Sequence, residues 1–160
     1  SRGHRHICML ISSRVDTSVY GIRWNAYQDV LRQRGLEHNL PHVVESHYIC
    51  SNACPVLTEY LTLHPEITAV CSAVDVATPA AVRAVRNTGR MPGKDVAIIS
   101  FDGMEALQYC MPSITTFEQP QAEMTNYVYD LLLGLIDGKR QHLHITFQAK
   151  FHENESCPPL

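Results

Sequence analysis

Apolar positions along the chain follow two alternating patterns, short continuous runs and longer stretches with an apolar residue at every third or fourth position. Continuous runs are typical of strands buried on both faces, and the wider spacing is typical of amphipathic helices. Strands are predicted at residues 7–11, 42–49, 67–73 and 96–101. A helix follows each of the first three, ended by Gly35, by Pro65 and by Gly89. This alternation predicts an α/β fold with a parallel sheet flanked by helices.

The second half of the chain carries weaker signals and then one strong one. Residues 103–111 predict a short helix closed by Pro112, and residues 114–117 a short extended crossing. A long amphipathic helix is predicted at 121–136, with the apolar stripe Met124, Tyr127, Val128, Leu131, Leu132 and Leu135. Residues 143–151 alternate as a half-exposed strand does, and an irregular tail follows.

Size and composition narrow the class of protein. With 160 residues the chain is one domain's worth, and its net charge of -3 argues against a nucleic-acid surface on this piece. There is no apolar run long enough for a membrane span and no signal-peptide pattern, so we expect a cytoplasmic protein without membrane contact. Two of the six cysteines, Cys8 and Cys71, lie in apolar runs, which indicates reduced thiols. The chain starts without Met and enters a strand at once, so we interpret it as a fragment of something longer.

The spacing of the cysteines and histidines and the motifs present give little support for a metal or a cofactor. The pair Cys50 and Cys54 lacks a second pair at zinc-finger spacing, and we interpret the histidine pairs as surface residues. The turn at residues 89–94 lacks the length and the hydroxyl of a phosphate loop. No nucleophile or dinucleotide motif occurs, so neither an enzyme nor a cofactor is predicted.

Polar side chains gather where the predicted strands end. Ligands of open parallel sheets bind beyond the carboxyl ends of the strands. The candidates there are Ser12, Ser13, Arg14 and Thr17 after the first strand, Tyr48 at the second, Asp75 at the third and Asp102 at the fourth. Hydroxyls, an aromatic ring and two carboxylates suit a sugar or a nucleoside better than a phosphate. The alternative is that Asp75 and Asp102 cap the helices that follow them.

An ordered series of motifs resembles the effector-binding core of LacI/GalR-type bacterial transcriptional repressors. The series covers nearly the whole chain, from residues 3–7, 23–27 and 64–70 through Asp75 and residues 95–102 to 112–120 and 155–157. The resemblance implies the C-terminal subdomain of a type I periplasmic-binding-protein-like fold. It also implies that the DNA-binding helix-turn-helix and most of the N-terminal subdomain are absent.

By this resemblance, effector contacts fall on Arg23, Tyr48, Asp75 and Asp102, with Thr17 as a weaker candidate. From its position alone, Arg23 would be interpreted as an exposed helix residue. Two departures from the family pattern concern the ligand, since Val74 replaces a common Asn and Gly103 a common Asp. Val74 cannot hydrogen-bond a hydroxyl, so the identity of the sugar does not transfer.

The resemblance also implies a division of the chain and a homodimer. Residues 1–112 are expected to form the effector-binding subdomain, 113–142 a crossing segment and helix of the other subdomain, and 143–160 the returning strand and tail. Pro79, Leu107 and Cys110 are the candidate dimer contacts, with Met104 and Met111 beside them; the alternative is that these residues fill the edge of the core. We expect the apolar stripe of residues 121–136 to pack against another copy or to fold back on this one.

Three classes of function follow from the sequence. The first is the sensor of a transcriptional regulator, whose partners are a small-molecule effector and, through the absent headpiece, DNA. The second is a sugar-binding protein of periplasmic type, which would normally carry an export signal and avoid unpaired cysteines. The third is a small α/β enzyme, for which no motif was found.

Overall fold

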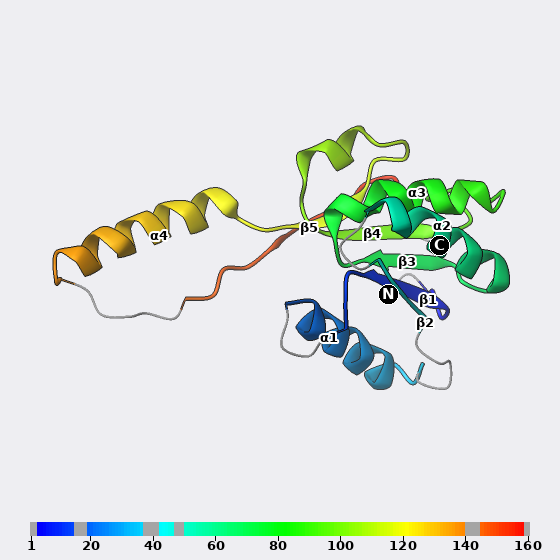
Figure 1. Cartoon of the computed structure of the whole chain (residues 1–160), viewed down its shortest axis with the longest axis horizontal. Coiled ribbons are helices and arrows are strands. Elements are labelled where there is room, and N and C mark those ends of the chain that lie inside the picture. The colour runs from blue at the N-terminus through cyan, green and yellow to red at the C-terminus, as the bar shows by residue number, and fades with distance from the viewer. Residues whose placement is uncertain (1–2, 15–18, 37–41, 47–49, 140–144, 159–160) are drawn as a thin grey trace.

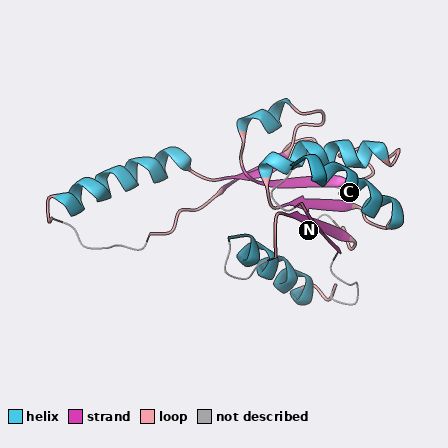
Figure 2. Ribbon diagram, in the orientation of Figure 1, coloured by secondary structure: helices cyan, strands magenta, loops and turns pink. Residues whose placement is uncertain are grey.

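The computed structural model contains a six-stranded sheet with helices on both faces (Figure 1, Figure 2). It describes residues 3–14, 19–36, 42–46, 50–139 and 145–158. The strands are β1 (Ile7–Ile11), β2 (His42–Glu45), β3 (Ala69–Ser72), β4 (Ala97–Asp102), β5 (Thr115–Glu118) and β6 (Lys150–His152). They lie in the order β2-β1-β3-β4-β5-β6, and only the β5–β6 pair is antiparallel. The predicted α/β class is confirmed.

Three helices cover the two faces of the sheet. The α-helices are α1 (Val19–Gln33), α2 (Cys50–Leu63), α3 (Thr78–Asn87) and α4 (Gln121–Ile136), and the short 3-10 helices are η1 (Asp75–Ala77) and η2 (Glu105–Tyr109). Helices α2 and α3 pack side by side on one face, and α1 lies on the other (Figure 1). This arrangement leaves the carboxyl ends of the strands accessible from one end of the molecule.

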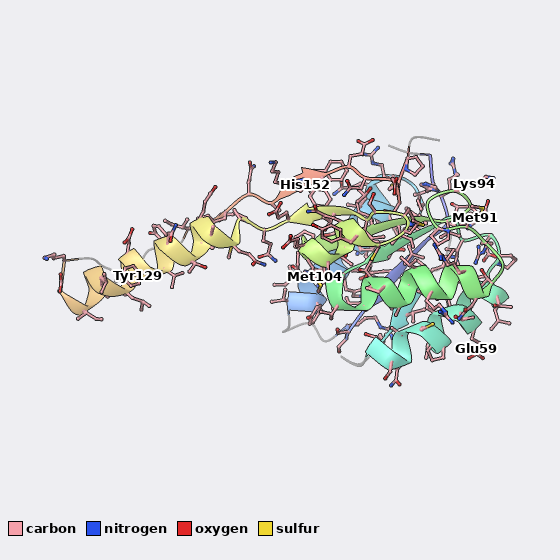
Figure 3. The ribbon with its side chains drawn as sticks, turned by 90° about the horizontal axis from the view of Figure 1, so that it is seen from above. Glu59, Met91, Lys94, Met104, Tyr129 and His152 are labelled. Carbon is pink, nitrogen blue, oxygen red and sulfur yellow. The ribbon has the colours of Figure 1, made fainter. Side chains whose placement is uncertain are left out.

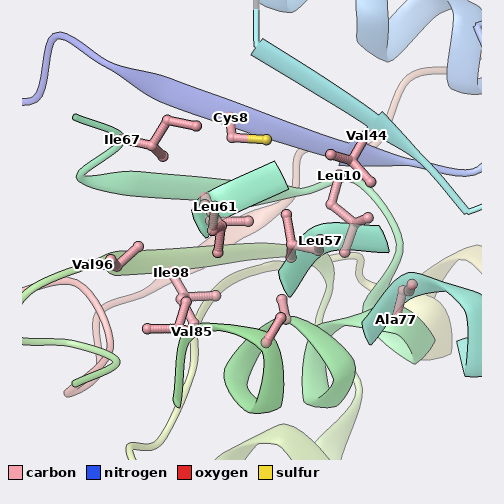
Figure 4. Packing of buried hydrophobic residues seen from close by; sticks show 14 of the residues in the cluster. Cys8, Leu10, Val44, Leu57, Leu61, Ile67, Ala77, Val85, Val96 and Ile98 are labelled. Carbon is pink, nitrogen blue, oxygen red and sulfur yellow. The ribbon is translucent and has the colours of Figure 1, made fainter. Parts of the chain in front are cut away.

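Strand β1 shows why a continuous apolar run was required. Cys8 and Leu10 point into the larger core cluster, under α2 and α3 (Figure 4). Met9 and Ile11 point the other way, into a smaller cluster with Trp24 of α1. Because successive side chains of a strand alternate between its faces, burial on both sides needs apolar residues at every position.

The predicted glycine stops are used as helix ends. After α1, the amide of Leu36 donates to the carbonyl of Leu31 at 2.9 Å, and that of Gly35 to Arg32 at 3.0 Å. This pair of bonds is a Schellman motif, which requires a left-handed residue, and Gly35 has a φ of 64°. Gly138 ends α4 in the same way.

Two strands are shorter than predicted. β2 ends at Glu45, and residues 47–49 of the prediction lie outside the described residues. In the alternating segment 143–151, residues 150 and 151 lie in β6 and pair with β5, residues 145–149 form no strand, and residues 143–144 lie outside the described residues. Alternation alone predicts a strand, but a strand also needs a neighbour to bond.

Helix α4 stands apart from the rest of the molecule. It leaves the carboxyl end of β5 and extends away from the sheet, with side chains projecting from it into solvent, including Tyr129 (Figure 1, Figure 3). The described part of α4 contains no buried residue, although the Tyr127 ring lies against Phe147 with centroids 5.9 Å apart. The helix therefore does not fold back onto the body of this chain. No helix in the described part of the chain is long and apolar enough to cross a membrane.

The three candidate dimer contacts differ in their exposure to solvent. Leu107 is only 1% exposed, because η2 turns it inward, so it belongs to the core as the alternative reading had it. Pro79 is exposed and Cys110 is half-buried. Large apolar side chains next to them are more accessible, with Tyr109 81% and Met111 79% exposed.

Candidate ligand-binding site

An open cleft lies at the carboxyl ends of the central strands, where α4 leaves the body. It has a volume of about 1040 Å³. Its lining comes from the segments after β3 and β4, from residues 118–123, and from Gln148 and Lys150 on the returning chain. The cleft therefore lies where ligands of parallel sheets bind, and residues on both sides of the crossing contribute to it.

Asp102 is the centre of a polar cluster at this cleft. The Arg23 guanidinium donates to both of its carboxylate oxygens, at 2.8 Å through Nη2 and 3.5 Å through Nη1. The side-chain amide of Gln119 donates to Oδ1 at 2.5 Å. The Asp102 backbone has a φ of 114°, a conformation that L residues rarely adopt. Strain of this kind is maintained only where the surroundings determine it, and it concentrates at ligand sites.

Arg23 reaches the site from the second turn of α1. Its Nη1 also donates to the carbonyl of Ala73, and its guanidinium lies 4.4 Å from the centroid of the Phe101 ring. The planar guanidinium is suited to such a forked and stacked position, which a lysine could not reproduce. The interpretation of Arg23 as an exposed helix residue is wrong, since its side chain is only 18% exposed, and the effector contact that the resemblance implies stays a prediction.

Asp75 lies deeper, only 4% exposed. Its carboxylate accepts a hydrogen bond from the Ser100 hydroxyl and one from the Met104 amide at 2.5 Å. Having donated its proton, the Ser100 hydroxyl accepts from Thr78 at 2.7 Å. Burial, with a smaller contribution from the nearby Asp102 charge, raises the pKa of Asp75 above that of an ordinary aspartate, although these hydrogen bonds oppose the shift. Asp75 thus fixes the loop that forms the floor of the cleft.

The capping alternative for the two aspartates is wrong. Helix α3 begins at Thr78 with Ala77 as its cap residue, and η2 is preceded by Met104. Neither helix has a side-chain hydrogen bond at its cap. Both carboxylates instead bond groups of other segments, and their contact with a ligand stays a prediction.

Gly103 closes the cleft wall against β5. Its φ is 82°, and a Cβ atom built on it would lie 2.5 Å from the Cα of Glu118. The neighbouring backbone cannot yield that much space, so only glycine fits this approach. At this position, where the sequence departs from the common family residue, the loop packs closely on β5.

The remaining predicted ligand contacts, Thr17 and Tyr48, lie outside the described residues. Gln119 was not singled out as a site residue, although it belongs to the segment 112–120 that carried the resemblance. Its position one residue beyond β5 is the signal that the strand-end argument could have used.

Comparison with known proteins decides the family. A model of the periplasmic binding protein-like domain matches residues 1–157. The chain belongs to this family. Within the periplasmic binding protein-like domains, it is related to the C-terminal effector-binding part of LacI/GalR-type regulators, as the sequence motifs predicted.

The relatives of this periplasmic binding protein-like chain are transcriptional regulators. The regulator MalR of Clostridium butyricum is 26% identical over 150 residues, which are 94% of this chain and 45% of MalR. A LacI-family regulatory protein from Chloroflexus aggregans has a similar structure, with 27% identity and a TM-score of 0.86, over 98% of this chain and 57% of that one. The regulator CelR in complex with cellobiose matches at 26% identity and a TM-score of 0.85, over 96% of this chain and 47% of CelR. The chain thus spans about half the length of the proteins it resembles.

Proposed function

We propose that the chain is the ligand-sensing part of a LacI-type transcriptional regulator and that its cleft binds a small molecule of the sugar type. The observation that carries this proposal is the cluster of Arg23, Asp102 and Gln119 at the cleft. It presents a carboxylate acceptor beside fixed nitrogen donors, which together suit adjacent hydroxyl groups of one ligand. The cellobiose complex of the relative CelR supports the ligand class.

The proposed mechanism uses the crossing between the body and α4. We assign residues 1–112 to one subdomain, 113–142 to a crossing segment and helix of a second, and 143–160 to the return. The cleft is lined from both sides of that crossing, by Asp102 on the body and by residues 121–123 at the start of α4. A ligand that contacts both sides favours one orientation of the two subdomains, and it shifts the equilibrium by its difference in affinity for the two. DNA affinity of an attached headpiece would follow that orientation.

We also propose that the longer protein is a homodimer and that its interface includes the surface around η2. Pro79, Cys110, Tyr109 and Met111 contribute to this surface, hereafter the η2 surface. Exposed apolar side chains that lie close together are typical of interaction sites rather than of free surface. Leu107 contributes by holding η2 in place from the interior.

The test is calorimetric titration of the longer protein that contains this chain with mono- and disaccharides, their phosphates and nucleosides. A sugar is expected to bind, and Asp102→Ala and Arg23→Ala should each weaken it at least about tenfold, because each substitution leaves the other charge of the pair unpartnered. The matched control is Asp29→Ala with Arg32→Ala, an exposed ion pair on the outer part of α1. The control pair should bind as wild type does.

Two results would contradict the proposal. Sugar binding that is unchanged in both Asp102→Ala and Arg23→Ala would place the site elsewhere. Failure of every compound in the panel to bind would exclude a sugar-type ligand. The periplasmic-type binding protein is less favoured, because the relatives MalR and CelR are transcriptional regulators.

A further inference from the structure

Three metal-ligating side chains meet at the end of the sheet opposite the cleft. His42 is the first residue of β2, whereas His64 and Glu66 lie in the turn between α2 and β3. Since these strands are parallel, their first residues face away from the end that carries Asp102 and α4 (Figure 1). We call these three residues the histidine cluster, and nothing in the proposed function uses them.

The ligand atoms of the cluster are already close to one another. One nitrogen or oxygen of each residue lies within 4.8 Å of those of the other two. The Nδ1 of His64 is 3.1 Å and the Nε2 of His42 is 3.9 Å from the same carboxylate oxygen of Glu66. Ligands of a tetrahedral zinc ion, bound at about 2.0–2.1 Å, lie roughly 3.3–3.4 Å apart. The two observed distances bracket that value.

His42 is oriented in the way that metal-ligating histidines usually are. Its Nδ1 lies 3.0 Å from the hydroxyl of Tyr60, while its Nε2 faces Glu66. With the proton on Nδ1 and donated to Tyr60, the lone pair of Nε2 points into the cluster. A hydrogen bond from the second ring nitrogen to a neighbouring group is the typical support of a histidine ligand.

The backbone that carries the other two ligands is held in place. Arg90 donates to the carbonyl of Leu61 at 2.9 Å and to that of Ile67 at 2.8 Å, on either side of the turn. The amide of Ile67 donates to the carbonyl of His64 at 3.2 Å. The side chains of His64 and Glu66 remain 36% and 42% exposed, so they can adjust around an ion and leave room for water.

We propose that the histidine cluster binds a divalent transition-metal ion of the zinc type. His42 Nε2, one ring nitrogen of His64 and the carboxylate of Glu66 are the ligands, and water takes the fourth position. Two imidazoles with one carboxylate suit zinc, whereas magnesium and calcium prefer oxygen ligands alone. The bound ion links β2 to the α2–β3 turn and therefore stabilises the folded chain.

The protonation states favour this assignment. Burial, and then the neighbouring His64, lowers the pKa of His42 below that of an ordinary histidine, so its ring is neutral at pH 7. Hydrogen bonds that its carboxylate accepts from its own backbone amide and from His64 lower the pKa of Glu66, which keeps the carboxylate ionised. Metal ligation requires a neutral imidazole and an ionised carboxylate.

The experiment is calorimetric titration of metal-free chain with ZnCl₂ at pH 7.5, together with the melting temperature at each zinc concentration. Wild type should bind one ion per chain and melt at a higher temperature with zinc. His64→Ala and Glu66→Gln should each reduce the zinc affinity at least about tenfold and remove the zinc-dependent rise in melting temperature. Glu66→Gln is nearly isosteric and guards against misfolding.

The controls separate this site from other zinc ligands. Glu59→Gln removes an exposed carboxylate of α2 outside the cluster, and His152→Ala removes a histidine of β6; both should bind zinc as wild type does. The same titration after alkylation of accessible thiols should also be unchanged. Zinc binding that survives both cluster substitutions, that disappears only on alkylation, or that is absent in wild type would each overturn the proposal.

Discussion

Gly103 is the residue on which the shape of the cleft wall depends most directly. Gly103→Ala should destabilise the chain by about 1–3 kcal/mol, because the new methyl group meets the backbone of Glu118 and the residue keeps a positive φ. The matched control is Gly89→Ala, where φ is 77° but no atom lies within 4 Å of the added Cβ. Urea unfolding of both variants measures the difference. Equal losses would show that the close approach to Glu118 has no energetic weight.

Asp75 should leave a signature in the pH dependence of stability. Its pKa is raised in the folded chain, so between the ordinary value of about 3.9 and the raised value the folded state binds more protons than the unfolded one. Its contribution to stability is therefore present at low pH and falls as the pH rises through that interval. Asp75→Asn cannot titrate, and the difference in unfolding free energy between wild type and variant should shift against wild type as the pH rises above about 3.9.

The measurement is urea unfolding of both proteins at several pH values. Titrating groups far from Asp75 contribute equally to both proteins and cancel in the difference. A difference that does not change with pH would show that Asp75 has the same affinity for protons in both states.

Sequence reasoning found the carboxylates of the site but not its contacts. Asp75 and Asp102 were predicted because strand ends in a parallel sheet meet at one edge. Only the resemblance placed Arg23 at the site, and its pairing with Asp102 across 79 positions was not predicted, since a helix residue away from the sheet edge gives no local signal. The histidine cluster was missed for the same reason, because β2 and the α2–β3 turn bring His42 to residues 22 and 24 positions later.

Among the elements, α4 has apolar side chains that the described part of the chain leaves largely uncovered. Tyr127 contacts the returning segment, but Val128, Leu132 and Ile136 are largely exposed. The 160-residue chain alone should therefore associate through α4 beyond any dimer formed by the η2 surface, and Val128→Glu with Leu132→Glu should remove that further association. Sedimentation velocity over a range of concentrations measures this. Asn126→Glu, an exposed polar position of α4, is the control, and a wild-type chain that stays monomeric throughout would contradict the prediction.

The elements differed in how well pattern alone defined them. Helix α4 was predicted with its observed bounds, because its spacing and its glycine stop are both local signals. The final strand was overestimated, because its length depends on which residues find a partner in β5. Residues 105–109 form a 3-10 helix, whose inward side chain, Leu107, could not be distinguished from its outward ones by spacing.

At the scale of the whole molecule, the proposed dimer is tested at exposed residues of the η2 surface, because Leu107 is buried. Tyr109→Glu with Met111→Glu should convert the longer protein from dimer to monomer, because two charges would be placed in an apolar interface. Met91→Glu, at another exposed apolar position, should leave the dimer intact. Light scattering after size-exclusion chromatography measures the mass. Leu107→Glu is unsuitable for this test, since it buries a charge and should unfold the chain.

Ser156, close to the last described residue, bridges two neighbouring strands of the sheet, β4 and β5. The Ser156 hydroxyl donates to the carbonyl of Ile98 at 2.6 Å and accepts from the amide of Thr115 at 2.8 Å. These bonds join residues 58 and 41 positions apart, so the chain must travel out along α4 and back before β4 and β5 are locked together. During synthesis, β5 should remain an open sheet edge until its partners in β6 emerge, 32 to 36 positions later. We therefore expect the parallel core to form first and its outer edge to close last.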